Sequence, residues 1–218
     1  MRLTHRDRLL ACINRDSSLD RPPVAFWRHF PVDDQSPVTL ADATLAFQQQ
    51  FDFDFIKVTP ASSYCLTDWG ARDKWEGSTE GTRSYINKVI KNKEGWEKLT
   101  ILDPFTSKYL SQHLDCLRRI RKNTSKETPV LQTIFSPLAQ AKNLAGREDL
   151  LAGIRQYPEL VSRGLEIIAE TTRKFIEAVI EIGIDGIFFA IQHAQARELS
   201  LAEYGIFGIP NDNICLDP

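Results

Sequence analysis

Stretches with apolar residues every three or four positions alternate along this chain with short, mostly apolar runs. The first pattern is typical of an amphipathic helix and the second of a buried strand. Helices are predicted over residues 4–15, 39–50, 109–122, 136–146 and 158–182, and strands over residues 24–27, 53–58, 129–135 and 187–191. Helices and strands therefore alternate along most of the chain, as expected of a parallel sheet with helical crossovers.

Capping residues, proline and glycine mark the ends of the predicted helices. Thr4 and Asp7 form a capping-box-like start for the first helix. Pro137 opens the fourth helix, which ends at Gly146, and Gly183 ends the long fifth helix. These signals agree with the boundaries that the apolar pattern predicts.

The pattern of hydrophobic and polar positions changes in residues 61–103. Gly77 and Gly81 separate short stretches, and residues 82–87 alternate between polar and apolar as a solvent-exposed hairpin would. A short helix is predicted around residues 96–99. We interpret this region as a hairpin excursion from the main sheet after the second strand.

Four β–α units fit two architectures, an open doubly wound sheet or part of a barrel. A doubly wound nucleotide-binding sheet has a glycine-rich turn after its first strand, whereas this chain has Trp27-Arg28-His29-Phe30-Pro31 there. The barrel is therefore favoured. Because eight β–α units need about 250 residues, residues 1–218 are predicted to be a single incomplete domain, the N-terminal portion of a (β/α)8 TIM-type barrel from a longer protein.

Composition narrows the class of protein. The 27 Lys and Arg against 29 Asp and Glu give a net charge of −2, without the basic surplus of nucleic-acid or anionic-membrane binders. No apolar run approaches membrane-spanning length, and the chain starts without a signal-peptide core, so a cytoplasmic location is expected. No metal site is expected either, because no CxxC or CxH spacing joins Cys12, Cys65, Cys116 and Cys215.

Two candidate site residues follow the first predicted strand. A guanidinium near the mouth of a barrel needs an anionic partner, so Arg28 binds either a substrate or one of the nearby carboxylates, Asp33 or Asp34. His29 either donates a proton or points outward, because side chains alternate along a strand.

Other candidates belong to the later strands. Lys57 interrupts the apolar second strand and either binds a substrate carboxylate or extends to the rim of the barrel. Gln192 and His193 follow the last strand, on the catalytic face of any β–α barrel, where His193 either transfers a proton or forms a structural hydrogen bond. Asp68 is interpreted as a turn former and Asp185, on the opposite face, as a structural residue.

Six segments share a common resemblance. In chain order they are Arg6-Asp7-Arg8-Leu9-Leu10-Ala11, Asp20-Arg21-Pro22-Pro23-Val24 with Trp27-Arg28, Phe53-Asp54-Phe55-Ile56-Lys57-Val58, Trp69-Gly70, Phe135-Ser136-Pro137-Leu138-Ala139-Gln140-Ala141 with Gly146, and Gly183-Ile184-Asp185-Gly186-Ile187. Together they resemble the uroporphyrinogen decarboxylase family over residues 5 to 208. No single segment is specific, but the collection is, and it implies a distorted (β/α)8 barrel.

The resemblance also implies an activity. The best-known members are homodimeric, cofactor-free decarboxylases of porphyrin biosynthesis, which remove carboxyl groups from the acetate side chains of a tetrapyrrole at the mouth of the barrel. Such a substrate carries several carboxylates, which arginine binds bidentately. Protonation of the pyrrole creates an electron sink for the departing CO2, so the site also needs an acid and a carboxylate facing the pyrrole N–H groups.

Some positions of this chain depart from the family's pattern. Arg28 matches the first arginine of its motif, whereas Phe30-Pro31-Val32 stands where the second is expected. Thr59-Pro60-Ala61-Ser62-Ser63 contains no acid where the family has its pyrrole-facing aspartate. The family's tyrosine falls near Lys142 and Asn143. A serine expected after the fourth strand is replaced by His193 or its neighbour.

Three functions follow from these residues. The first is tetrapyrrole decarboxylation, with His193 and His29 as catalytic residues and Arg28, Lys57 and Gln192 binding the substrate. The second is methyl transfer from a corrinoid or a methylated small molecule, which would require zinc and cobalamin and is favoured by the missing acid and second arginine. The third is a non-catalytic remnant that associates with another chain through exposed strand edges.

Overall fold

The computed structural model describes residues 3–217; Met1, Arg2 and Pro218 of the predicted domain lie outside the described residues. The longer helices are α1 (His5–Ile13), α2 (Pro37–Phe51), α4 (Lys108–Lys122), α5 (Pro137–Ala145), α6 (Arg147–Gln156) and α7 (Pro158–Glu181). The shorter ones are α3 (Lys93–Glu97), α8 (Leu201–Phe207), α9 (Ile209–Leu216) and the 3-10 turns η1 (Asp33–Gln35) and η2 (Thr67–Trp69). The strands are β1 (Ile56–Val58), β2 (Asp73–Trp75), β3 (Arg83–Tyr85), β4 (Val130–Phe135) and β5 (Gly186–Ala190).

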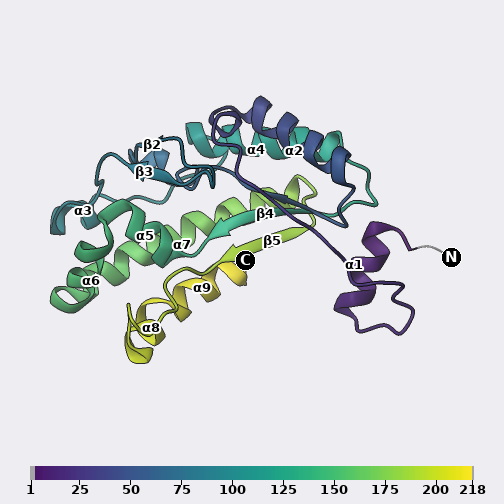
Figure 1. Ribbon diagram of the computed structural model, residues 1–218. Helices are drawn as coiled ribbons and strands as arrows, with labels where there is room; N and C mark the ends of the chain where they lie inside the picture. Colours follow the sequence, from purple (N-terminus) through teal and green to yellow (C-terminus); the bar gives the residue numbers. More distant parts are fainter. Residues whose placement is uncertain (1–2, 218) are drawn as a thin grey trace.

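The main sheet is parallel, as predicted, with the strand order β1-β4-β5. Val58 pairs with Gln132 and Phe135 with Ala190. The predicted hairpin is also present, since β2 and β3 form a separate antiparallel pair in which Asp73 faces Tyr85. The architecture is the α/β fold of a partial TIM-type barrel (Figure 1).

Helices cover one face of the main sheet. On β4, Gln132 faces α4, because its Oε1 accepts a hydrogen bond of 3.0 Å from His113. The buried apolar sides of α4 and α7 form much of the core, with Leu114, Leu117 and Leu165 fully buried. Since neighbouring side chains in a strand alternate in direction, Lys57 of β1 and Leu131 of β4 face the opposite, concave side.

The predicted strand over residues 24–27 is wrong. The segment is extended but forms no ladder, and its backbone contact with the second strand region is one hydrogen bond, from Asp54 N to Val24 O. Nor is it buried, because Phe26 is 67% exposed and Trp27 46%. In the described residues no second strand pairs with the outer side of this segment, so neither its backbone nor its side chains are enclosed.

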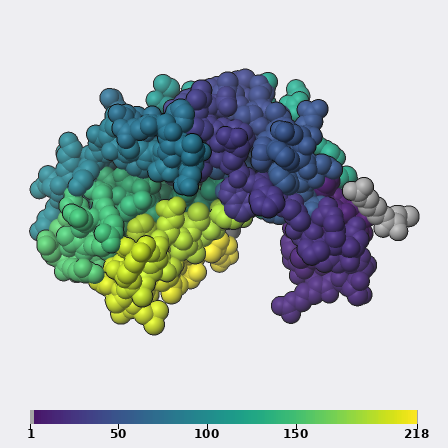
Figure 2. Space-filling model, viewed as in Figure 1, coloured from purple at the N-terminus to yellow at the C-terminus, as the bar shows by residue number. Residues whose placement is uncertain are grey.

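The last predicted strand, over residues 187–191, is present as β5 but is less buried than its apolar pattern predicts. β5 pairs with β4 alone within the described residues, and Phe188 on its concave side is 36% exposed. An apolar sequence therefore marks an edge strand here. In Figure 2 the molecule is an arch, and a hollow separates the N-terminal α1 end from the C-terminal α8–α9 end.

A buried carboxylate joins α1 to the rest of the fold. Asp54 accepts a hydrogen bond of 2.5 Å from Arg8 and another of 2.6 Å from Arg21, and it also accepts the backbone N–H of Val24. Burial alone would raise the pKa of Asp54, but the hydrogen bonds from Arg21, Val24 and Arg8 hold it well below its usual range. This carboxylate therefore stays charged and fixes the start of the chain.

Three helices were not predicted: α6, α8 and α9. α8 has a complete capping box, in which Ser200 and Glu203 satisfy each other's backbone N–H groups. The predicted helices at residues 4–15, 39–50, 109–122, 136–146 and 158–182 match α1, α2, α4, α5 and α7 within two or three residues at each end.

Candidate active site

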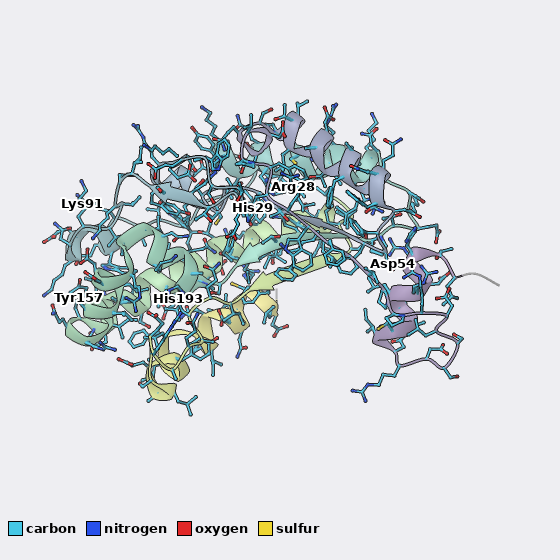
Figure 3. The ribbon with its side chains drawn as sticks, viewed as in Figure 1. Arg28, His29, Asp54, Lys91, Tyr157 and His193 are labelled. Atoms are coloured by element: carbon cyan, nitrogen blue, oxygen red, sulfur yellow. The ribbon has the colours of Figure 1, made fainter. Side chains whose placement is uncertain are left out.

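The carboxyl ends of β1, β4 and β5 lie along one edge of the sheet, and several predicted site residues lie on or after these strands. Figure 3 shows Arg28 and His29 beside each other on the segment before α2, and His193 apart from them near α8. The fold therefore places these residues over the sheet's carboxyl ends, but does not gather all of them into one cluster.

Lys57 occupies the centre of the concave face. Its Nζ lies 4.7 Å from the ring centroid of Trp27 and 4.4 Å from that of Phe188, and the residue is only 8% exposed. The side chain therefore does not extend to the rim. Burial lowers the pKa of Lys57 to about 8. Within the described residues Lys57 forms no ion pair, so no carboxylate of residues 3–217 neutralises its ammonium.

Arg28 lies at the surface and, among residues 3–217, forms no structural ion pair. Its Nε donates to the backbone oxygen of His29 at 3.2 Å, and its guanidinium lies 5.5 Å from the ring centroid of Phe30. Asp34, one of the two carboxylates near it in sequence, instead accepts from Arg83 at 2.6 Å. The guanidinium therefore keeps most of its donors available for a ligand.

His29 is half-buried beneath the β2–β3 hairpin. Its Nδ1 is buried and has no hydrogen-bond partner within the described part of the chain. Burial lowers the pKa of His29, the charge of Lys57 lowers it further, and the charge of Asp34 opposes this shift. The imidazole is therefore neutral near pH 7 and is close enough to Lys57 to respond to a ligand that binds there.

His193 lies in the loop after β5 and is 7% exposed. Its Nδ1 is likewise buried without a partner among the described residues. Burial lowers its pKa, as does the charge of Lys142, whereas Glu198 opposes the shift. Lys142 on α5 is itself half-buried and forms no ion pair in the part of the chain that the structure describes.

Gln192 does not join the other residues. It is exposed, and its backbone oxygen accepts from Gln195 at 2.9 Å. No hydrogen bond of its side chain is present among residues 3–217, so its predicted role in substrate binding stays a prediction.

Two aspartates have structural roles. Asp68 accepts the backbone N–H groups of Tyr109 and Leu110 at 3.0 and 2.9 Å and so caps the start of α4. Asp185 accepts from Arg6 and Arg121 at the amino-terminal side of the sheet, as its predicted structural role requires. Both carboxylates are therefore occupied by contacts within the fold.

A buried group of charges beside His29 was not predicted. Arg83 of β3 donates to Asp34 at 2.6 Å and lies 3.6 Å from Asp73, and the three side chains are at most 8% exposed. Asp34 and Arg83 are 49 residues apart in sequence, so no local pattern could have indicated their contact. Arg83 also donates to the backbone oxygen of Pro31, and it thereby fastens the hairpin to the segment that carries His29.

The described residues do not fit a zinc ion. They contain no group of three His, Cys, Asp or Glu side chains that could hold a metal. Cys65, Cys116 and Cys215 are buried free thiols, and burial raises the pKa of each to about 12, which opposes the thiolate form that zinc requires. Separately, none of the helices between residues 3 and 217 is both long and apolar enough to span a membrane.

Comparison with known proteins supports the fold and identifies the family. No curated protein matches the sequence. Among solved structures, a methyltransferase from Methanosarcina mazei superimposes with a TM-score of 0.83 at 17% identity, over 96% of this chain and 65% of that chain. This chain thus spans less than two thirds of that methyltransferase. The sequence model described as uroporphyrinogen decarboxylase (URO-D) matches residues 4–212, so the chain belongs to the uroporphyrinogen decarboxylase family.

Proposed function

We propose that this chain supplies the carboxylate-binding part of a cofactor-free decarboxylase that acts on the acetate side chains of a tetrapyrrole in the cytoplasm, as a homodimer. The observation that carries the proposal is Lys57, a buried amine on the concave face with no carboxylate partner among the described residues. A buried ammonium is costly unless it is paired, and a substrate carboxylate would provide the missing charge.

The surroundings of Lys57 suit a substrate with both carboxylates and an apolar ring system. Trp27 and Phe188 offer exposed aromatic surface beside the amine. Arg28 has free donors for a second carboxylate, and Lys142 adds a further cation on the α5 side that is unpaired among the described residues. No nucleic acid enters this proposal, since the ligand it requires is small and polycarboxylic.

His29 and His193 are the proton donors of the proposed reaction. Both have a lowered pKa and are neutral before substrate arrives. Bound carboxylates would raise both pKa values, so that the imidazole binds a proton as the substrate enters. Transfer of that proton to a pyrrole carbon lets the ring accept the electron pair of the breaking C–C bond. CO2 then leaves, the exocyclic carbon takes up a proton, and the ring proton returns to the histidine.

Methyl transfer is the second candidate function. The observation that favours it is residues 59–63, which follow β1 and contain no carboxylate to face pyrrole N–H groups. The fold shared with the Methanosarcina mazei methyltransferase is compatible with it. Because the described residues do not fit zinc, no step through zinc or cobalamin is derived for this chain.

Absorbance titration with uroporphyrin tests the first proposal. We expect binding that weakens about tenfold in Lys57→Met, because one charge-assisted contact is lost, and that is unchanged in Lys91→Met, which removes an exposed lysine far from Arg28 and His29 (Figure 3). Equal affinities of the two variants would contradict the role of Lys57. Binding of methylcobalamin but not uroporphyrin would favour methyl transfer instead. If the chain proves to be a self-associated species on size-exclusion chromatography and binds neither compound, the non-catalytic hypothesis is supported.

A further inference from the structure

The amine of Lys57 lies between two aromatic rings and has no ion pair or hydrogen bond within residues 3–217. Its Nζ is 4.7 Å from the ring centroid of Trp27 and 4.4 Å from that of Phe188, and the two rings are 5.4 Å apart. Burial lowers the pKa of Lys57 from an ordinary 10.5 to about 8. Near pH 8 this lysine is therefore a mixture of ammonium and free amine.

A small molecule can still reach this amine. The Nδ1 atoms of His29 and His193 are fully enclosed, whereas Nζ of Lys57, which also has no partner among the described residues, retains accessible surface. The two rings beside it are open to the concave face, since Trp27 is 46% exposed and Phe188 is 36% exposed. A molecule that enters the concave face between these rings therefore meets the amine.

A free amine in apolar surroundings is a nucleophile toward carbonyl groups. Its nitrogen adds to the carbonyl carbon, and one N–H proton moves to the oxygen to give a carbinolamine. The nitrogen lone pair then expels the hydroxyl, which takes up a proton and leaves as water. The nitrogen gives up its second proton and an imine remains. Amine and carbonyl thus give imine and water, without oxidation or reduction.

His29 is placed to move protons during this reaction. The charge of Lys57 helps to lower the pKa of His29, so the two side chains lie within electrostatic reach of each other. Asp34 and Arg83 also act on this imidazole, with opposite effects on its pKa. Although Nδ1 of His29 is enclosed, its Nε2 retains accessible surface. The neutral ring can therefore accept a proton from the added nitrogen and return it to the departing hydroxyl.

We propose that Lys57 forms a covalent imine with a small ketone or aldehyde whose apolar part packs between Trp27 and Phe188. This activity uses the neutral amine, whereas the proposed decarboxylase uses the ammonium, so neither depends on the other. Lys142 on α5 provides an internal comparison. It is half-buried and burial lowers its pKa, but no aromatic ring of the described residues lies over its amine.

Reaction of the whole chain with 2,4-pentanedione near pH 8 tests this inference. The imine of this diketone rearranges to an enaminone, which absorbs at longer wavelength than protein. We expect peptide mass mapping to find the enaminone on Lys57 about tenfold sooner than on Lys142 or the exposed Lys91, because more of Lys57 is free amine. Lys57→Met should lose this fast phase and Lys91→Met should retain it. The diketone has no carboxylate, so its reaction is independent of carboxylate binding.

A second pair of variants guards against a fold defect in Lys57→Met. Trp27→Ala removes a half-exposed ring, opens Lys57 to water and should slow the reaction severalfold. Its matched control is Trp75→Ala, which removes a partly exposed ring of the β2–β3 hairpin and should leave the rate unchanged. Absence of enaminone, modification of Lys142 or exposed lysines before Lys57, or equal rates in the two tryptophan variants would overturn the inference.

Discussion

Gly81 in the hairpin approaches His29 so closely that a side chain on this glycine would overlap the histidine. A Cβ built on Gly81 lies 2.8 Å from His29 Cγ and closer still to His29 Cβ. The backbone of Gly81 has φ of +72°, in the left-handed region that favours glycine. Since His29 Nδ1 has no hydrogen-bond partner among residues 3–217, packing under the hairpin is a main constraint on this imidazole.

Gly81→Ala should therefore destabilise the chain more than Gly77→Ala does. Gly77 also has a positive φ, of +89°, but no described atom lies within 4 Å of its built Cβ. We expect about 1 kcal/mol of backbone strain in both variants and a further 1 to 3 kcal/mol, roughly, in Gly81→Ala from the overlap with His29. Urea unfolding measures both. Equal losses of stability would show that the hairpin does not rest on His29.

Lys57 should make the stability of the fold rise with pH above neutrality. Its pKa is about 8 in the fold against 10.5 as the ordinary value, so the unfolded chain binds more protons between these pH values. The free energy of unfolding should therefore increase from about pH 8 to 10.5 in the original chain, and this increase should be smaller in Lys57→Met. Thermal unfolding at pH 7, 8, 9 and 10 provides the measurement.

The exposed Lys91 supplies the control for that pH series. Lys91→Met removes a lysine at the surface and should leave the slope of stability against pH as it is in the original chain. If Lys57→Met retains the same slope, burial does not disfavour the ammonium of Lys57, and its need for a substrate carboxylate loses its basis.

The long helices could be predicted from sequence because their signals are local. α7 has its apolar side at helical spacing, begins at Pro158 and is followed by Gly183 at φ +85°. The same holds for β4, a mostly buried strand between Pro129 and the cap Ser136 of α5. α8 could have been predicted too, because Ser200 and Glu203 have the spacing of a capping box.

The other features depend on contacts between distant parts of the chain. Residues 24–27 have a strand-like composition, but a ladder needs a partner, and the described residues provide one hydrogen bond from Asp54. Lys57 could be singled out as a charge in an apolar strand, whereas its position between Trp27 and Phe188 joins segments 30 and 131 residues away. Arg83 gave no local signal for its contact with Asp34.

Asp54→Ala should destabilise the fold far more than the removal of an exposed, ion-paired carboxylate does. Asp54 and Arg8 are 1% and 2% exposed, so removal of this carboxylate leaves a buried guanidinium with less compensation. A loss of about 3 to 5 kcal/mol is expected in urea unfolding. Asp42→Ala is the matched control, because the Asp42–Arg119 pair is about half exposed and should contribute less than about 1 kcal/mol. Similar losses in both variants would contradict the role of Asp54 as the anchor of α1.

The pH dependence of Asp54 provides an independent check. Its pKa in the fold lies well below the ordinary value, so its contribution to stability is complete above about pH 4 and is lost as pH falls toward the folded pKa. The difference in stability between the original chain and Asp54→Asn should therefore shrink as the pH is lowered from 5 to 3. A difference that stays constant over this range would mean that the contribution of Asp54 to stability does not depend on the charge of its carboxylate.

His113 should make the fold sensitive to moderately acidic pH. The pKa of His113 is about 4 in the fold and near 6.5 ordinarily, so the unfolded chain binds the extra proton between these values and stability falls as pH falls from 6.5 to 4. The loss attributable to His113 approaches about 3 kcal/mol at pH 4. His113→Gln retains an N–H that can reach Gln132 but does not titrate, so its stability should fall less over the same interval. Urea unfolding at pH 6.5, 5.5 and 4.5 compares the two chains, and other titrating groups cancel in the difference. Parallel curves would show that burial does not disfavour the protonated form of His113 in the fold.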